Sequence, residues 1–138
     1  MKISSGILFW RLNNKSPEIL LVHPSGDYNK HASWSIPKGL VENNESITDA
    51  AIRETKEEIG INVTEDDLEY FGYCIYKNKK KRVECFLTRS KFDESDLTFS
   101  WEIDRAQFSS LKEALNMIHK DQKVFIEKFI EIFNENDK

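Results

Sequence analysis

The chain has 138 residues, a formal net charge of -4 and a charged-residue content of 32%. This length and composition are typical of a soluble globular protein, and we expect one domain over residues 1–138. The acidic balance argues against general binding to nucleic acid. No apolar run is long enough to span a bilayer, and the N-terminus lacks the layout of a signal peptide. We therefore expect a cytoplasmic protein with no membrane partner.

The first third of the chain is predicted to be rich in strands. Aliphatic and aromatic residues predict strands over 3–11 and 18–23, separated by turn residues at 13–17. Residues 24–33 have the composition of a loop, and a short strand is expected over 33–36. The Pro-Lys-Gly sequence at 37–39 predicts a turn, and Asn43-Asn44 predicts another.

A helix is predicted between Ser46 and Gly60. Ser46 and Asp49 stand three residues apart, as in a capping box that satisfies free backbone N–H groups. Gly60 is expected to end the helix, because glycine takes the left-handed conformation at low cost.

The second half of the chain predicts a hairpin followed by a short strand and two helices. The hairpin covers 69–77 and 82–90 around a loop at 78–81, the strand 103–108, and the helices 110–118 and 121–134. This loop places Tyr73, Ile75, Glu84 and Phe86 on one face. Cys74, Tyr76, Val83 and Cys85 share the other face, where we expect buried, reduced thiols.

Three carboxylates crowd the last two turns of the predicted helix. Glu54, Glu57 and Glu58 are spaced by three and four residues, which places them on one helical face. The same face begins with Ile47, Ala50 and Ala51, so an inward-looking stripe changes from apolar to acidic. Buried carboxylates are costly unless a cation compensates them, and Mg²⁺ prefers such oxygen ligands. The alternative is a solvated charged face.

The surroundings of these carboxylates resemble the Nudix box of the Nudix hydrolases. From Gly39 the chain reads glycine, five residues, Glu45, seven residues, and then the nine residues RETKEEIGI at 53–61. Thr55 departs from the pattern, where a bulky aliphatic residue is usual, and so does Asn44, where glycine is common. The resemblance implies an α/β Nudix fold, with a mixed β-sheet sandwiched between helices.

The resemblance extends, more loosely, to most of the chain. Residues 34–39 resemble the W-x-x-P-K-G sequence of Nudix members that act on dinucleoside polyphosphates and inositol polyphosphates. Residues 102–108 are similar to the late strand of many members.

The resemblance implies a divalent metal cofactor, Mg²⁺ or possibly Mn²⁺ in its place. By position its ligands are Glu54, Glu57, Glu58 and the carbonyl group of Gly39. Arg53 is expected to orient a box carboxylate or a phosphate, with a surface pair to Glu57 as the alternative.

The reaction implied is attack of water on phosphorus in a diphosphate linkage, which requires a general base. Glu54 is the first candidate for this base and Glu102 the second, although a surface role suits Glu102 equally. Glu84 is a weaker third candidate that could simply face water. Glu45 is expected to brace the loop by pairing with Arg53.

Four residues are candidates for binding the substrate. Lys38 is placed to contact a phosphate, and Lys79 belongs to a basic hairpin tip that a polyphosphate would explain. Trp34 and Tyr76 could stack on a base. The alternatives are an exposed turn for the lysines and core packing for the aromatic residues.

We therefore expect metal-dependent hydrolysis of a diphosphate linkage in a small-molecule nucleotide, with dinucleoside polyphosphates favoured, by a monomer or homodimer. Alternatives are a house-cleaning nucleoside triphosphate pyrophosphohydrolase and a non-catalytic nucleotide-sensing module. Removal of pyrophosphate from RNA ends has support from the basic hairpin alone, and the acidic balance opposes it.

Overall fold

The computed structural model describes residues 1–78 and 80–136. Its centre is a six-stranded sheet with the order β4-β5-β1-β2-β6, in which β3 also pairs with β1. The strands are β1 (Lys2–Asn13), β2 (Ser16–Pro24), β3 (Lys38–Leu40), β4 (Glu69–Tyr76), β5 (Lys81–Arg89) and β6 (Ile103–Ser110). The helices are α1 (Ile47–Ile59), α2 (Leu111–Met117) and α3 (Lys123–Asn136). Within the described residues, no helix is long and apolar enough to cross a membrane.

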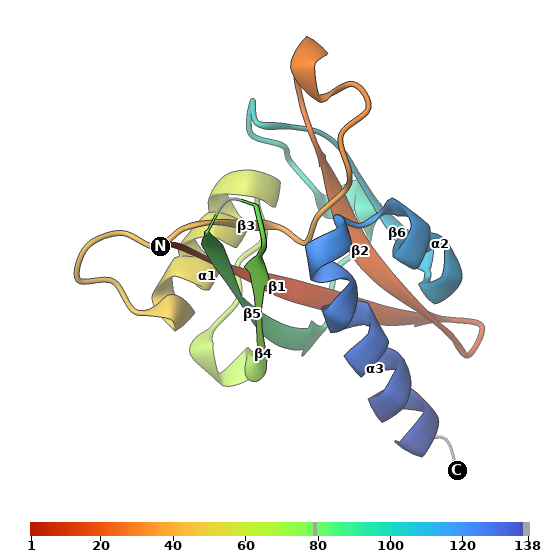
Figure 1. Ribbon diagram of the computed structural model, residues 1–138. Helices are drawn as coiled ribbons and strands as arrows, with labels where there is room; N and C mark the ends of the chain where they lie inside the picture. Colours follow the sequence, from red (N-terminus) through yellow and green to blue (C-terminus); the bar gives the residue numbers. More distant parts are fainter. Residues whose placement is uncertain (79, 137–138) are drawn as a thin grey trace.

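Helices cover both faces of the sheet, as expected for a sandwich (Figure 1). Alternate residues of β1 enter two separate cores, because successive side chains of a strand point to opposite faces. Ile7 and Phe9 pack in the core that contains Ala51 and Ile59 of α1. Leu8 packs in the other core, which α2 and α3 cover. β1 and β5 are parallel and the other strand pairs are antiparallel, so the predicted mixed sheet is confirmed.

The segment before α1 is a strand, so the turn predicted at residues 37–39 is wrong. β3 pairs with the first half of β1, whereas β2 pairs with its second half. Ile7 N–H also donates to the Pro37 carbonyl oxygen at 3.1 Å. This close approach requires Gly6, since a Cβ atom there would overlap Pro37 and Lys38. The pairing partner lies more than thirty residues away in the sequence, so the local Pro-Lys-Gly signal did not reveal it.

Helix α1 has the predicted limits. Ser46 Oγ accepts a hydrogen bond from the Asp49 backbone N–H at 3.0 Å, and Gly60 ends the helix at φ 74° in the left-handed region. These two caps set the ends of the helix and so place the acidic residues in its last two turns.

The β4–β5 hairpin forms with a register two residues away from the predicted one. Tyr76 pairs with Lys81 and Tyr73 with Glu84. A shift of two residues keeps every side chain on its face, because strands have a period of two. Tyr73 and Glu84 therefore share one face, and Cys74 and Cys85 are buried free thiols on the other, as expected.

Candidate active site

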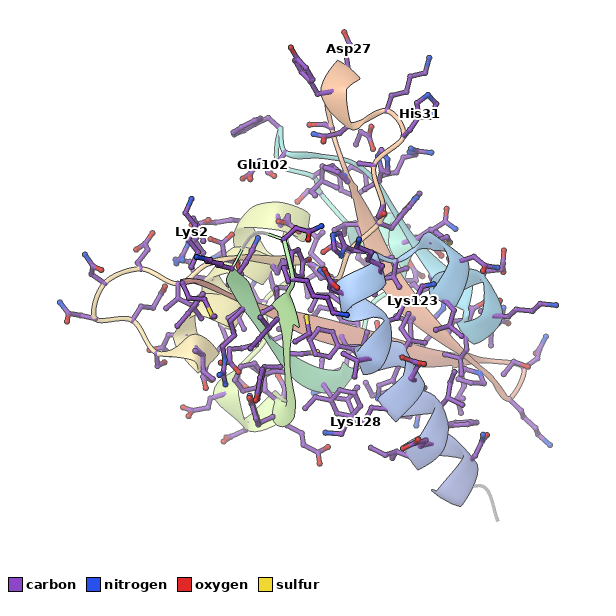
Figure 2. All side chains as sticks on the ribbon, viewed as in Figure 1. Lys2, Asp27, His31, Glu102, Lys123 and Lys128 are labelled. Carbon is purple, nitrogen blue, oxygen red and sulfur yellow. The ribbon has the colours of Figure 1, made fainter. Side chains whose placement is uncertain are left out.

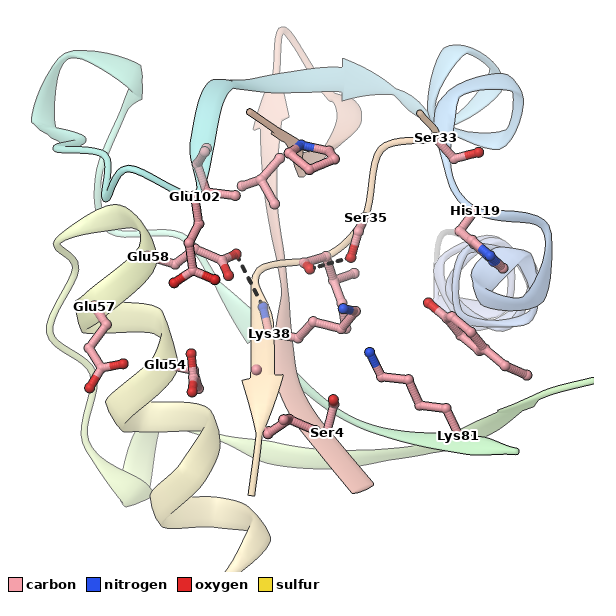
Figure 3. A pocket seen from close by; sticks show the side chains of 17 residues that line it. Ser4, Ser33, Ser35, Lys38, Glu54, Glu57, Glu58, Lys81, Glu102 and His119 are labelled. Carbon is pink, nitrogen blue, oxygen red and sulfur yellow. Dashed lines mark hydrogen bonds between the residues drawn. The ribbon is translucent and has the colours of Figure 1, made fainter. Parts of the chain in front are cut away.

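A cavity of about 540 Å³ lies beside the C-terminal half of α1 (Figure 3). Besides α1, the cavity is formed by β1, β2, β3 and the loop before it, the β4–β5 hairpin, the start of β6 and the loop before it, and the segment after α2. The lining residues are Ser4, Val22, Pro24, Ser33, Ser35, Ile36, Lys38, Gly39, Leu40, Glu54, Glu57, Glu58, Tyr76, Lys81, Glu102, Ile103 and His119. Their charges are segregated, with carboxylates at the α1 side and cations toward the hairpin.

Glu58 is the most buried carboxylate of the cavity, with 7% of its surface exposed. Its Oε1 atom accepts a hydrogen bond from the Lys38 backbone N–H at 3.3 Å. Burial raises the pKa of Glu58 to about 8; the Lys38 charge opposes this rise, and Glu102 and Glu54 add to it. The Glu58 backbone carbonyl also accepts from Ser100 N–H at 3.1 Å, which ties the loop before β6 to the helix.

Glu54 lies one turn earlier and faces Gly39. Its Oε1 atom accepts from Arg53 Nη1 at 2.8 Å. Burial raises the pKa of Glu54, and Arg53 partly offsets this effect, whereas Glu57 and Glu102 reinforce it. A Cβ atom at position 39 would overlap the Glu54 carboxyl group. Glycine at position 39 therefore leaves the space in which the Glu54 carboxyl group lies against β3.

Glu57 lines the cavity from its rim and does not continue the buried stripe expected from the sequence. Its side chain is 58% exposed, and Oε2 accepts from Arg53 Nη1 at 3.2 Å. Thr55 occupies the buried side of this turn and is completely inaccessible to solvent. Its Oγ1 atom has no hydrogen-bond partner among the described residues. The unusual threonine therefore serves as a small core residue.

Arg53 links the carboxylates of the box to one another. Nε and Nη2 donate to the two carboxylate oxygens of Glu45 at 2.8 and 3.0 Å, so the expected pair forms and is bidentate. Nη2 also donates to the Leu40 carbonyl at 2.9 Å. These anions raise the pKa of Arg53 above its usual range, chiefly through the Glu45 hydrogen bond. The guanidinium group thus holds Glu54 against a fixed loop.

Glu102 comes from the loop before β6 (Figure 2), and its side chain lies beside Glu58 in the cavity (Figure 3). Its backbone carbonyl accepts from Ser25 N–H at 2.8 Å, which fixes the loop before β6 to the end of β2. Glu84, by contrast, does not line the cavity. It is buried, accepts from Tyr70 Oη and from Arg82 Nε at 2.6 Å each, and so does not face water as the sequence had suggested. These contacts leave Glu54 and Glu102 as the two base candidates within the cavity.

The carboxylates suit a divalent cation in chemistry, although their side chains do not surround a common point. Among the described residues, no group of three or more His, Cys, Asp or Glu side chains is arranged to hold a metal ion. The charge of Glu102 nevertheless raises the pKa of both Glu54 and Glu58 inside one cavity, and Glu54 also raises that of Glu58. A cation bound among them would remove this repulsion, and oxygen donors are those that Mg²⁺ prefers.

The other end of the cavity carries two lysines and two stacked rings. Lys38 and Lys81 line it, and the rings of Tyr76 and His119 stack at 4.3 Å with an interplanar angle of 8°. His119 had no predicted role, because its contact with Tyr76 depends on long-range packing. Trp34 is not brought into the lining; its ring packs against His23 at 5.3 Å. Lys79 lies outside the described residues.

Comparison with known proteins identifies the family of this chain. The family model described as NUDIX domain matches residues 3–129. An RNA pyrophosphohydrolase of Campylobacter jejuni is 32% identical over 115 residues, covering 74% of each chain. A C. elegans Ap4A hydrolase in a binary complex aligns with a TM-score of 0.76 and 26% identity, over 98% of this chain and 99% of that one. A MutT protein from Methanosarcina mazei aligns with a TM-score of 0.73 and 25% identity, over 99% and 96%. The chain therefore belongs to the Nudix hydrolase family.

Proposed function

We propose that this enzyme hydrolyses a diphosphate linkage in a dinucleoside or nucleoside polyphosphate, using Mg²⁺ or Mn²⁺. The observation that supports this most strongly is the charge separation within the cavity, with carboxylates at one end and Lys38, Lys81 and two stacked rings at the other. A polyphosphate with a nucleoside at its end matches this order. The Ap4A hydrolase named among the similar structures agrees with such a substrate.

The acidic end is the proposed place of reaction. Glu54, Glu57, Glu58 and the Gly39 carbonyl would hold the metal, which supplies an acidified water and neutralises phosphate charge when bound. Arg53 orients Glu54 through the hydrogen bond at 2.8 Å. Glu54 remains the first candidate for the general base and Glu102 the second, since both line the cavity.

Lys38 and Tyr76 are the proposed substrate contacts. The Lys38 side chain extends toward Lys81 at the cationic end of the cavity, where its ammonium group would meet a phosphate (Figure 3). Tyr76 offers a ring at the cationic end for a nucleoside.

A second candidate substrate is the triphosphorylated 5′ end of RNA. It is supported by the RNA pyrophosphohydrolases of Campylobacter jejuni, which are 31–32% identical to this chain. The lysines of the cationic end would suit this substrate as well.

The test is a panel of substrates incubated with the protein and Mg²⁺, with products separated by chromatography. The panel holds dinucleoside tetraphosphates, nucleoside triphosphates, diphosphate sugars and triphosphorylated RNA oligonucleotides. We expect cleavage of the dinucleoside polyphosphate or the RNA at a pyrophosphate bond, and none after chelation of the metal. Absence of cleavage across the whole panel would contradict the proposal.

A further inference from the structure

A buried amide joins three distant segments behind the cationic end of the cavity. Gln122 is completely buried and lies in the short turn before α3. Its side chain contacts Ser35 and Ile36 from the segment before β3, and Tyr76 from the end of β4. All three partners line the cavity, whereas Gln122 itself does not.

The polarity of these contacts is fixed by the backbone. The Ile36 N–H group is a donor, and it donates to Gln122 Oε1 at 3.1 Å. The Nε2 atom must therefore face the two hydroxyl groups, and it donates to Tyr76 Oη at 2.6 Å and to Ser35 Oγ at 3.2 Å. One oxygen and two N–H groups of the amide are all used, so flipping the amide would break the bond to Ile36.

These contacts determine which hydrogen bond the Tyr76 hydroxyl group can still make. Since Tyr76 Oη accepts from Gln122, its own hydrogen is available for an acceptor. Ser35 is already committed, because Ser35 Oγ donates to the Ile36 carbonyl at 2.6 Å. Within the described part of the chain, the Gln122 contact is the one hydrogen bond found for the Tyr76 hydroxyl. The Tyr76 ring is at the same time held parallel to His119, which begins the turn that contains Gln122.

We propose that Gln122 is a positioning residue for the nucleoside end of the substrate. It fixes the Tyr76 ring and directs the tyrosine hydroxyl to act as a hydrogen-bond donor toward the bound nucleoside. This inference rests on the proposed function, because it assumes a nucleoside at the cationic end. It assigns to Gln122 no part in the chemical step, which takes place at the opposite end of the cavity.

The test compares Gln122→Met with Tyr76→Phe, which removes the hydroxyl group and keeps the ring. Two probes separate the ends of the substrate: KM for the nucleotide that the wild-type enzyme cleaves, and the inhibition constant of inorganic tripolyphosphate, which has no nucleoside. Gln107→Met is the matched control, because Gln107 also donates from Nε2 to a serine, Ser109 Oγ at 2.9 Å, but does not line the cavity or touch its lining.

We expect Gln122→Met and Tyr76→Phe each to raise KM about fivefold to tenfold, the effect of one lost buried hydrogen bond, with kcat and tripolyphosphate inhibition unchanged. The double variant should show less than the product of the two effects, because both act on the same hydroxyl group. Gln107→Met should leave KM unchanged.

Two results would overturn the inference. One is a Tyr76→Phe enzyme with wild-type KM, which remains decisive even if Gln122→Met fails to fold. The other is an equal loss of affinity for the nucleotide and for tripolyphosphate, which would make Gln122 a purely structural residue. Both leave the proposed function intact, since that would fail only if the wild-type enzyme cleaved no substrate of the panel.

Discussion

Glu45, in the loop before α1, and Arg53, in α1 itself, form a bidentate ion pair with N–O distances of 2.8 and 3.0 Å. The remaining Nη1 atom of Arg53 then reaches Glu54 at 2.8 Å. The Glu45 carboxylate therefore orients a cavity carboxylate that it does not touch. This connection makes Glu45 a positioning residue for Glu54, although Glu45 itself does not line the cavity.

Replacing Arg53 by lysine keeps the charge and removes the planar fork. We expect Arg53→Lys to lower kcat at least about tenfold, because a lysine cannot bind Glu45 through two atoms and Glu54 through a third. The change in the unfolding temperature should be small. Steady-state kinetics and thermal unfolding measure the two effects. Full activity in the lysine variant would show that Arg53 supplies charge alone.

Glycine at position 39 is predicted to keep the Glu54 carboxyl group in its place in the cavity. Gly39→Ala places a Cβ atom where the Glu54 carboxyl group lies, so either β3 or Glu54 must move. We expect turnover to fall strongly while KM changes less. Ile75→Ala is the control, because Ile75 is a half-exposed strand residue that does not line the cavity. Equal activities of the two variants would contradict the close packing of β3 on α1.

The raised pKa of Glu58 makes the stability of the metal-free protein depend on pH. The folded protein keeps the Glu58 proton up to about pH 8, whereas the unfolded chain releases it near 4.5. The contribution of Glu58 to the free energy of unfolding is therefore fully present below pH 4.5 and is lost as the pH rises through 8. The loss amounts to roughly 5 kcal/mol, since one pKa unit corresponds to about 1.4 kcal/mol.

Chemical unfolding of the metal-free protein at several pH values tests this dependence. The free energy of unfolding should fall between pH 5 and pH 8, and Glu58→Gln should flatten the slope. Added Mg²⁺ should restore stability most at high pH, where Glu58 is ionised. A wild-type slope in the Glu58→Gln variant would assign the effect to another group.

Lys38 is predicted to distinguish long polyphosphates from short ones. Lys38→Ala should raise KM for a dinucleoside tetraphosphate about tenfold, through loss of a charge-assisted contact, and KM for a diphosphate sugar less. Lys30→Ala, at an exposed position in the loop after β2, serves as the control. If Lys38→Ala raised KM equally for the two substrates, Lys38 would not be the residue that distinguishes polyphosphates by length.

Sequence predicted α1 well because its signals are local. Ser46 and Gly60 act on backbone groups within one turn, and both ends of the helix lie where they indicate. The β3 strand was missed, since its hydrogen bonds join residues 4–6 to residues 38–40. The burial of Glu57 was overestimated for a related reason. A helical wheel predicts the face on which a residue lies. Its exposure depends on whether other segments of the folded chain cover that part of the face.

The two ends of the cavity differed in how much the sequence revealed. The spacing of the Nudix-box residues predicted the acidic end, because the residues that form this end are close together in the sequence. The cationic end combines Ser35, Tyr76, His119 and Gln122, which come from three separate segments. A glutamine in a polar turn before a helix carries no local signal of burial, so its three contacts emerged only from the folded chain.

The most direct measurement is a crystal soaked in Mn²⁺ with a non-hydrolysable dinucleoside polyphosphate, with the metal located by its anomalous scattering. We predict manganese at the C-terminal half of α1, with Glu54, Glu57 and Glu58 turned toward it and a bridging phosphate beside it. Metal found elsewhere, with these carboxylates directed into solvent, would contradict the account.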